Sequence, residues 1–199
     1  MAVAKFVQAA PKTIYQQGTY VEYVQTKGKN KGKVSIKIDR TVPEDENDEP
    51  LINQGESYYW WTLPYSRKRY SKTRPKDSEL TSSEYFSQVY EFAERVEEMI
   101  VESPEELKEF VEELKMDVES LKADTESNLE RIPENLQYGP TAVKLEERID
   151  SLDEAIDKLD DIDCDYTYPT AQMEAGGNFD KMKQWLDERI LQLKTISFG

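Results

Sequence analysis

Apolar residues recur at alternating spacings of four and three across the second half of the chain, and this pattern constrains the fold more than any other feature. Side chains at these spacings lie on one face of a helix, so each run predicts an amphipathic helix with one buried stripe. The three runs are Tyr85, Val89, Phe92, Val96 and Met99; Leu107, Val111, Leu114, Val118 and Leu121; and Leu145, Ile149, Leu152, Ile156 and Leu159.

Capping signals mark where two of these helices begin. Ser103 precedes a proline and lies three residues before Glu106, which predicts an N-cap with proline at the first helical position. Thr81 and Glu84 have the spacing of a capping box, so Thr81 is expected to cap the first helix along the chain. Both signals come just before an apolar run, as a helix start requires.

Pro133 and Gly139-Pro140 mark a reversal of the chain between the second and third helices. A short turn between two such helices implies an antiparallel hairpin of coiled-coil type. The loop that follows, over residues 165–178, leads into a last helix with Met182 and Leu186 on one side. The expected helices are about 82–102, 104–132, 141–163 and 179–196.

The first part of the chain has the two-residue alternation of short strands. Residues 19–41 predict a β-hairpin that turns at the lysine- and glycine-rich segment 27–33. Residues 42–56 are interpreted as a polar connection, and residues 57–63 and 67–73 as a further strand and its return strand. We therefore expect an α+β protein with a β module of three to five strands over residues 1–78 and a helical domain over 79–199.

Charge divides the chain at nearly the same place. Residues 1–76 carry 14 Lys and Arg and 8 Asp and Glu, whereas residues 77–199 carry 12 and 33, which together give the net charge of −15. An acidic surface repels nucleic acid and attracts basic protein surfaces. The pattern predicts either two functional surfaces or one functional surface on a solubilising body.

Composition removes several classes of function. The chain has no histidine and one cysteine, which excludes Ser-His and Cys-His catalysis, an internal disulfide and a multi-cysteine zinc site. It has no phosphate-binding or dinucleotide-binding fingerprint. We therefore expect a non-enzymatic protein with no cofactor and no bound metal. Since the sequence has neither a run of about 20 apolar residues nor a signal peptide at its start, we expect a cytoplasmic protein without membrane contact.

Aromatic and basic residues are interleaved after residue 57. On a strand, Tyr58 and Trp60 face one way and Tyr59 and Trp61 the other, so one face can be core while the other needs a cover or a partner. Three interpretations stay open: internal packing, a protein interface, and binding of single-stranded nucleic acid. The residues expected to anchor a partner are Tyr58, Tyr59, Trp60, Trp61, Arg67, Lys68, Arg69, Tyr70 and Lys72.

Acidic residues cover the outer positions of the third predicted helix. Regular rows of carboxylates can imitate the phosphates of DNA, so one hypothesis is a DNA mimic that occupies a nucleic-acid site on another protein. The alternative is an ordinary solvated helix face. The apolar seam could also serve homodimerisation. The candidate mimic face is Asp150, Asp153, Asp157, Asp160 and Asp161.

Several segments carry a resemblance to known proteins. The stretch 27–33, the run PEDENDE at 43–49, GESYYWW at 55–61 and YSKTRPK at 70–76 resemble an uncharacterised family of tailed-bacteriophage proteins. Residues 51–61 also look like the central hairpin of zinc-knuckle modules in other phage proteins. Those modules have cysteines on both sides of the hairpin, and this chain has none there, so a related module here would be metal-free.

The resemblance implies a viral protein acting in a bacterial cytoplasm. With the charge pattern, it leads us to expect an accessory protein that binds, and thereby inhibits, a host or viral protein such as a nucleic-acid-handling or defence enzyme. Two alternatives stay open: a nucleic-acid-binding protein that uses the basic-aromatic module, and a scaffolding component of a virion or of its assembly.

Overall fold

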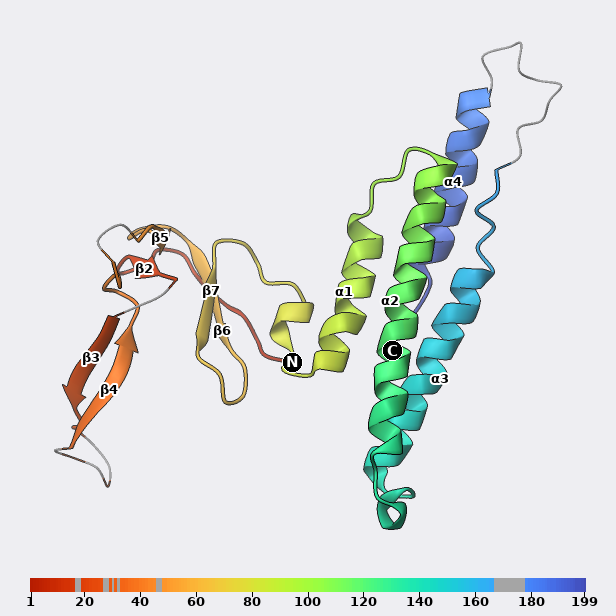
Figure 1. Cartoon of the computed structure of the whole chain (residues 1–199). Coiled ribbons are helices and arrows are strands. Elements are labelled where there is room, and N and C mark those ends of the chain that lie inside the picture. The colour runs from red at the N-terminus through yellow and green to blue at the C-terminus, as the bar shows by residue number, and fades with distance from the viewer. Residues whose placement is uncertain (17–18, 27–28, 30, 32, 46–47, 167–177) are drawn as a thin grey trace. The chain divides into compact units, whose positions relative to one another are not determined.

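Small antiparallel sheets followed by helices make this an α+β protein, as the sequence predicted (Figure 1). The computed structural model describes the chain except residues 17–18, 27–28, 30, 32, 46–47 and 167–177. Parts of three predicted segments, the turn at 27–33, the acidic run at 44–49 and the loop at 165–178, therefore lie outside the described residues.

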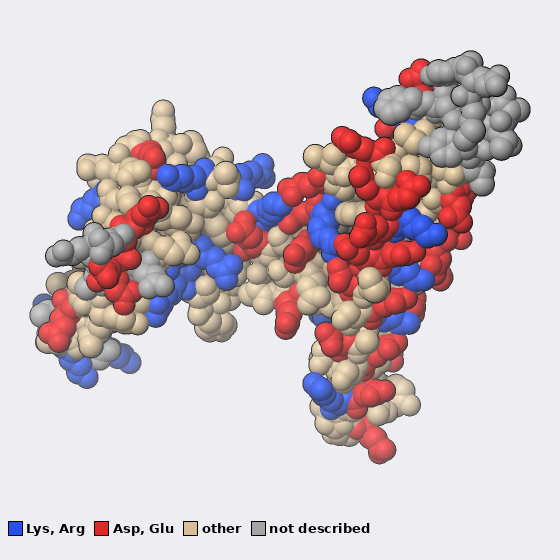
Figure 2. Space-filling model, turned by 45° about the horizontal axis from the view of Figure 1, so that its top comes forward, with Lys and Arg blue, Asp and Glu red and all other residues tan. Residues whose placement is uncertain are grey.

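The chain divides into two compact units, Met1–Ser82 and Ser83–Gly199. The first unit carries 14 Lys and Arg and 10 Asp and Glu, a net charge of +4; the second carries 12 and 31, a net charge of −19, and the two sum to −15. Figure 2 shows acidic side chains spread over the helical unit.

The described part of the N-terminal unit contains seven short strands in three antiparallel sheets. The first sheet has the order β1-β6-β7, the second pairs β2 with β5, and the third pairs β3 with β4. Their bounds are β1 (Lys5–Val7), β2 (Ile14–Tyr15), β3 (Thr19–Val24), β4 (Val34–Asp39), β5 (Pro50–Ile52), β6 (Tyr58–Thr62) and β7 (Lys68–Ser71).

The prediction of three to five strands was wrong, because three strands were missed. β5 lies inside the segment that was interpreted as a polar connection, and neither β1 nor β2 was predicted. Each has only two or three residues and is formed by pairing with a distant segment, such as Phe6 with Tyr59 and Ile14 with Ile52. Strands this short have too few residues to show a two-residue alternation.

Both faces of β6 are packed, each into a different cluster. Tyr58 lies with Ala10, Ile14 and Ile52, while Trp61 lies with Leu63 and Leu80. Leu80 comes from the 3-10 helix η1 (Ser78–Leu80). Of the two possibilities left open for the second face of this strand, a cover or a partner, the structure shows a cover, since different parts of the unit pack against the two faces.

The turn between β6 and β7 has an unusual backbone. The Ser66 amide donates to the Leu63 carbonyl at 3.1 Å, and Tyr65 adopts a φ of 58°. Pro64 followed by a residue with positive φ is the geometry of a type II turn. Such a turn favours glycine at the second of its two central positions. Tyr65 holds that position with its side chain fully exposed.

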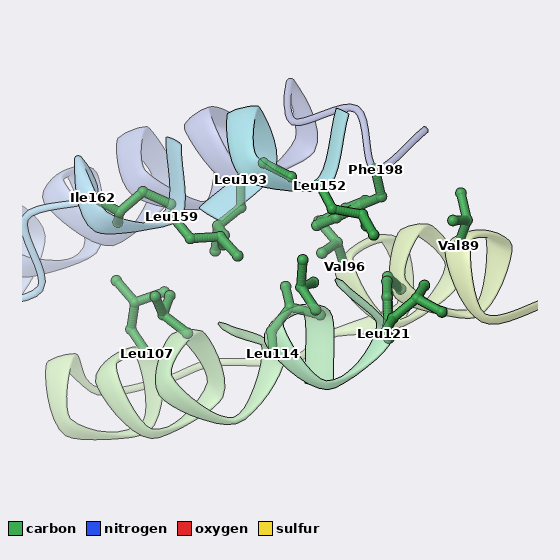
Figure 3. Packing of buried hydrophobic residues seen from close by; sticks show 14 of the residues in the cluster. Val89, Val96, Leu107, Leu114, Leu121, Leu152, Leu159, Ile162, Leu193 and Phe198 are labelled. Carbon is green, nitrogen blue, oxygen red and sulfur yellow. The ribbon is translucent and has the colours of Figure 1, made fainter. Parts of the chain in front are cut away.

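The described part of the second unit contains four α-helices: α1 (Glu84–Glu98), α2 (Pro104–Glu130), α3 (Pro140–Asp160) and α4 (Asn178–Lys194). They run alternately up and down, and α2 with α3 forms the predicted antiparallel hairpin (Figure 1). All four helices contribute to one apolar cluster, together with Phe198 (Figure 3). The stripes on α1 and α2 pack inside the chain itself, so they are not free for a homodimer.

Two details of the helical prediction were wrong. The N-cap of α1 is Ser83, which accepts from the Phe86 amide at 3.4 Å, so Thr81 lies outside the helix. On α3 the central buried position is Ala155, whereas Ile156 is only partly buried. The small methyl side chain of Ala155 lets two helices approach closely. A prediction that favours large apolar residues misses such a position.

Candidate binding groove

A groove of about 640 Å³ in the N-terminal unit gathers residues from five separate segments, and three of these contribute basic side chains. The segment before β2 contributes Lys12, β4 and the residues after it contribute Lys37 and Arg40, and the β6–β7 turn with β7 contributes Arg67 and Lys68. Pairing between strands distant in sequence brings these five cations around one hollow.

One carboxylate accompanies the five cations. Asp39 accepts hydrogen bonds from the hydroxyl of Thr41 at 2.7 Å and from its amide at 3.0 Å. These two bonds, then the nearby charges of Lys37 and Lys12, lower the pKa of the Asp39 carboxyl. Asp39 is therefore ionised at neutral pH and offsets one of the five positive charges.

The groove cations are not neutralised by ion pairs. None of the five has a carboxylate of a described residue within 4.0 Å. In the helical unit, by contrast, Lys108, Lys115, Lys122, Lys158 and Lys194 all pair with acids. The groove therefore keeps a positive charge that a ligand can use.

Aromatic rings position Arg40 and Lys68, two of these cations. The Arg40 guanidinium lies 5.7 Å from the centre of the Tyr70 ring and donates to the Lys68 carbonyl at 3.1 Å. The ammonium groups of Lys68 and Lys5 lie over the Trp60 ring at 4.3 and 5.0 Å. Such contacts restrict long side chains whose charged ends remain available. Burial raises the pKa of the Tyr70 phenol, which stays a neutral donor.

The other wall of the groove is apolar and belongs to the β3–β4 hairpin. Tyr20 and Ile36 are 65% and 67% exposed, and Ile38 lies beside them. Ile14 and Tyr58 lie deeper, where the hollow meets the buried cluster. A ligand with both negative and apolar groups fits this combination of walls.

The structure separates the predicted anchor residues into two groups. Tyr58, Arg67, Lys68 and Tyr70 line the groove, whereas Tyr59, Trp60, Trp61, Arg69 and Lys72 do not. Sequence reasoning missed Lys12, Tyr20, Ile36, Lys37 and Arg40. The two-residue alternation around Ile36 was visible in the sequence. Nothing near it in the sequence indicated that this strand would line the same groove as β7.

Two of the excluded residues have clear structural roles. Trp61 is 2% exposed and donates its indole N–H to the Glu79 carbonyl at 3.0 Å, which removes it as an anchor for a partner. The Tyr59 ring packs against Phe6 with 5.1 Å between centroids. The Trp61 ring is therefore part of the core, while the Tyr59 ring is only partly buried beside the exposed Phe6.

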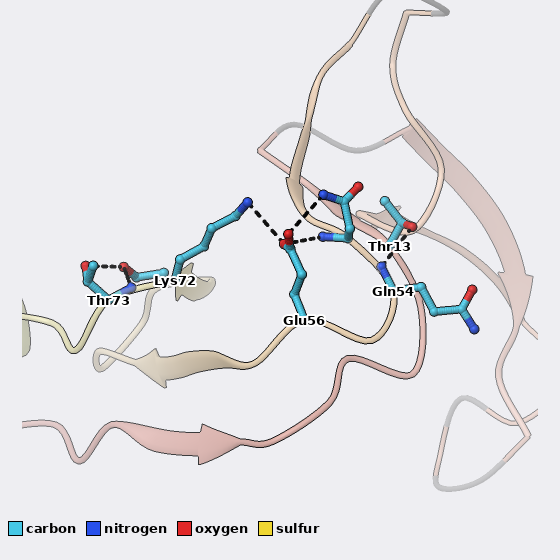
Figure 4. Close-up of polar contacts among 7 residues, drawn as sticks. Thr13, Gln54, Glu56, Lys72 and Thr73 are labelled. Carbon is cyan, nitrogen blue, oxygen red and sulfur yellow. Dashed lines mark hydrogen bonds and ion pairs between the residues drawn. The ribbon is translucent and has the colours of Figure 1, made fainter.

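Lys72 also has a partner within the unit (Figure 4). Its ammonium pairs with Glu56 at 3.1 Å, and the same carboxylate accepts from the Asn53 amide at 2.8 Å. The Asn53 backbone bond, followed by the bonds from Lys72 and the Asn53 side chain, lowers the pKa of Glu56 to about 2. This contact ties β7 to the turn before β6.

The candidate mimic face on α3 is divided by ion pairs with α2. Asp153 pairs with Lys122 and Asp160 with Lys115. The bonds to these carboxylates raise the pKa of both lysines. The remaining members of the predicted face, Asp150, Asp157 and Asp161, are exposed.

A smaller hollow of about 230 Å³ lies among α1, α2 and α3 of the helical unit. Its lining includes Glu84 and Asp124 but also Arg131 and Arg148, so it favours neither an anionic nor a cationic ligand. The Arg148 guanidinium lies 4.4 Å from the centre of the Tyr85 ring. The N-terminal groove is the stronger candidate because its five cations outnumber its single carboxylate, Asp39.

No family model, curated protein or solved structure matches this chain. Among the described helices, none combines the length and the apolar character needed to cross a membrane. Within the same residues, no three His, Cys, Asp and Glu side chains are grouped so that they could hold a metal ion. The functional assignment therefore rests on the geometry and charge of the groove.

Proposed function

We propose that this is a non-enzymatic accessory protein that binds a partner protein through the basic groove of its N-terminal unit. The observation that carries the proposal is the set of five unpaired cations around one carboxylate, beside an apolar wall. An acidic surface with neighbouring apolar side chains complements both features. Protein interfaces commonly combine such charge complementarity with aromatic and arginine anchors.

A protein suits this groove better than single-stranded nucleic acid. Nucleic-acid sites stack successive bases on several exposed rings. Here Tyr20 is the exposed ring, while Tyr58 is buried and Tyr70 is half-buried; the rest of the apolar wall is aliphatic.

The resemblance to tailed-phage proteins indicates which partners to test first. A host or viral protein in a bacterial cytoplasm, such as a nucleic-acid-handling or defence enzyme, is the partner we propose, and inhibition is the effect. The ion pairs of Asp153 and Asp160 weigh against the helices as a DNA mimic, because they partly neutralise two of its five carboxylates. In this proposal the helical unit is an acidic body that keeps the protein apart from nucleic acid.

Affinity capture from bacterial lysate tests the proposal. The tagged full chain is compared with a double variant, Arg67→Glu and Lys68→Glu, in which the groove loses its charge. The matched control is Lys29→Glu and Lys31→Glu, which changes the net charge equally at exposed residues outside the groove. A stoichiometric protein captured after nuclease treatment, lost with the groove variant and kept with the control, is expected.

Capture that depends on intact nucleic acid would reject the proposal in favour of nucleic-acid binding. Self-association without any partner would favour a scaffolding role. A protein partner that the groove variant retains would place the interface elsewhere on the molecule.

A further inference from the structure

The hydrogen-bonding pattern of the β3–β4 hairpin determines which backbone groups face outward. The Gln25 amide donates to the Lys33 carbonyl at 3.0 Å, and this pair continues the register of the hairpin. Bonded and non-bonded pairs alternate along an antiparallel ladder. The amide and carbonyl groups of Val34, Ile36 and Ile38 therefore point away from β3.

This outward edge of β4 has no strand beside it among the described residues. The structure gives no backbone bond from a described residue to the outward groups of these three positions. Two residues further on, the Arg40 carbonyl accepts from the Tyr15 amide at 2.8 Å. At that point the edge is already hydrogen-bonded to another segment of the same unit, so its geometry suits pairing with a strand.

The binding groove runs along this same edge. Successive side chains of a strand point to opposite faces. Nevertheless, all six consecutive residues 36–41 line the groove. Consecutive residues can border one hollow when the edge of the strand, and not one of its faces, lies beside it. The unpaired amides of β4 and the groove cations therefore border the same hollow.

Proteins normally protect such edges. Proline, lysine, a bulge or a covering loop prevents another chain from pairing. β4 has no proline, and Val34 and Ile36 are 61% and 67% exposed on its apolar face. Lys37 is the single basic residue within the strand, and it borders the groove. The edge is open, and its surroundings favour an acidic chain.

We propose that the groove binds an extended acidic segment of a partner protein, which joins β4 as an added strand. This inference rests on the proposed function and specifies its chemistry. Main-chain hydrogen bonds to Val34, Ile36 and Ile38 would supply affinity, and alternate side chains would supply specificity. Apolar side chains of the segment would lie beside Tyr20 and Ile36, while carboxylates would face Arg67 and Lys68.

The first test uses a fluorescein-labelled peptide of alternating glutamate and valine, with fluorescence anisotropy on the full chain. Ile36→Pro removes one outward N–H without breaking the ladder to β3, because proline is tolerated at an unpaired edge. We expect this variant to weaken binding at least about tenfold. Glu22→Pro is the matched control, since the Glu22 amide points outward from the opposite edge of the hairpin.

Peptide chemistry gives a second test that does not depend on a variant's folding. Methylating the peptide nitrogens of the valines, or alternatively those of the glutamates, blocks one edge of the peptide at a time. An added strand uses one edge, so one methylated peptide should lose binding and the other should keep it. Equal effects of the two methylation patterns would overturn strand addition.

Two further measurements separate this inference from the proposed function. If Arg67→Glu with Lys68→Glu weakens peptide binding while Ile36→Pro does not, the groove binds anions but not by strand addition. If the peptide does not bind at about 1 mM, or the charge-reversed groove binds it equally well, both proposals fail. Tighter binding of a short oligo-dT strand than of the peptide would also overturn both, in favour of nucleic acid.

Discussion

Truncating two residues one turn apart on α3 tests the internal packing of the helical unit. The apolar spacing treats Leu152 and Ile156 as equivalent, but Leu152 is fully buried whereas Ile156 lies at the margin of the cluster. Leu152→Ala removes apolar atoms and leaves a cavity, which costs about 3 kcal/mol of unfolding free energy. Ile156→Ala removes a similar volume from a site that water partly reaches, so it should cost about 1 kcal/mol.

Urea unfolding followed by far-ultraviolet circular dichroism measures this difference. The four described α-helices all belong to the second unit, so the helical signal reports on that unit. With a slope of about 1.5 kcal/mol per molar urea, the two midpoints should fall by about 2 M and about 0.7 M. Equal shifts would show that Ile156 is as deeply buried as Leu152, which would refute this reasoning.

Three smaller predictions concern single contacts. Ser103→Ala removes the hydroxyl that accepts from the Glu106 amide at 3.1 Å, and should lower the unfolding free energy of the helical unit by about 1 kcal/mol in the same urea assay; an unchanged midpoint would mean that the cap contributes nothing. Because the pKa of Glu56 is lowered from 4.5 to about 2, its contribution is present above pH 4.5 and is lost as pH falls towards 2. The melting temperatures of Glu56→Gln and the parent should therefore converge over that range, and a constant gap would contradict this. Tyr65→Gly relieves a positive φ without losing buried area, so it should stabilise the N-terminal unit by about 1 kcal/mol, measured by tryptophan fluorescence on heating; destabilisation would show that the Tyr65 ring makes contacts.

The helical unit was largely predictable because its signals are local. The apolar stripe of α2 and its cap at Ser103 can be read within one or two turns of helix, and both were confirmed. The buried face of α3 was harder to predict from the sequence. Whether Ala155 or Ile156 faces the centre depends on how closely the helices approach one another, which no single helix encodes.

The groove could not be predicted, because it is assembled by pairing over long distances. Lys12 and Arg67 lie 55 positions apart in the sequence and meet in the groove only because several short strands pair around it. Strands of two or three residues carry almost no propensity signal. The aromatic-basic stretch around Trp60 stands out in the sequence, but its composition could not distinguish the buried Trp61 from the groove residue Tyr70.

The place of Phe198 in the bundle has a consequence for how the protein is made. Leu193 and Phe198 are buried in the helical core, and the Phe198 ring meets Phe92 at 5.8 Å. During translation the helical unit therefore cannot complete its core until nearly all 199 residues have emerged from the ribosome. The N-terminal unit is closed within residues 1–82, where the Ala2 amide bonds to the Leu80 carbonyl. At roughly 5–20 residues per second, that unit has on the order of ten seconds to fold first.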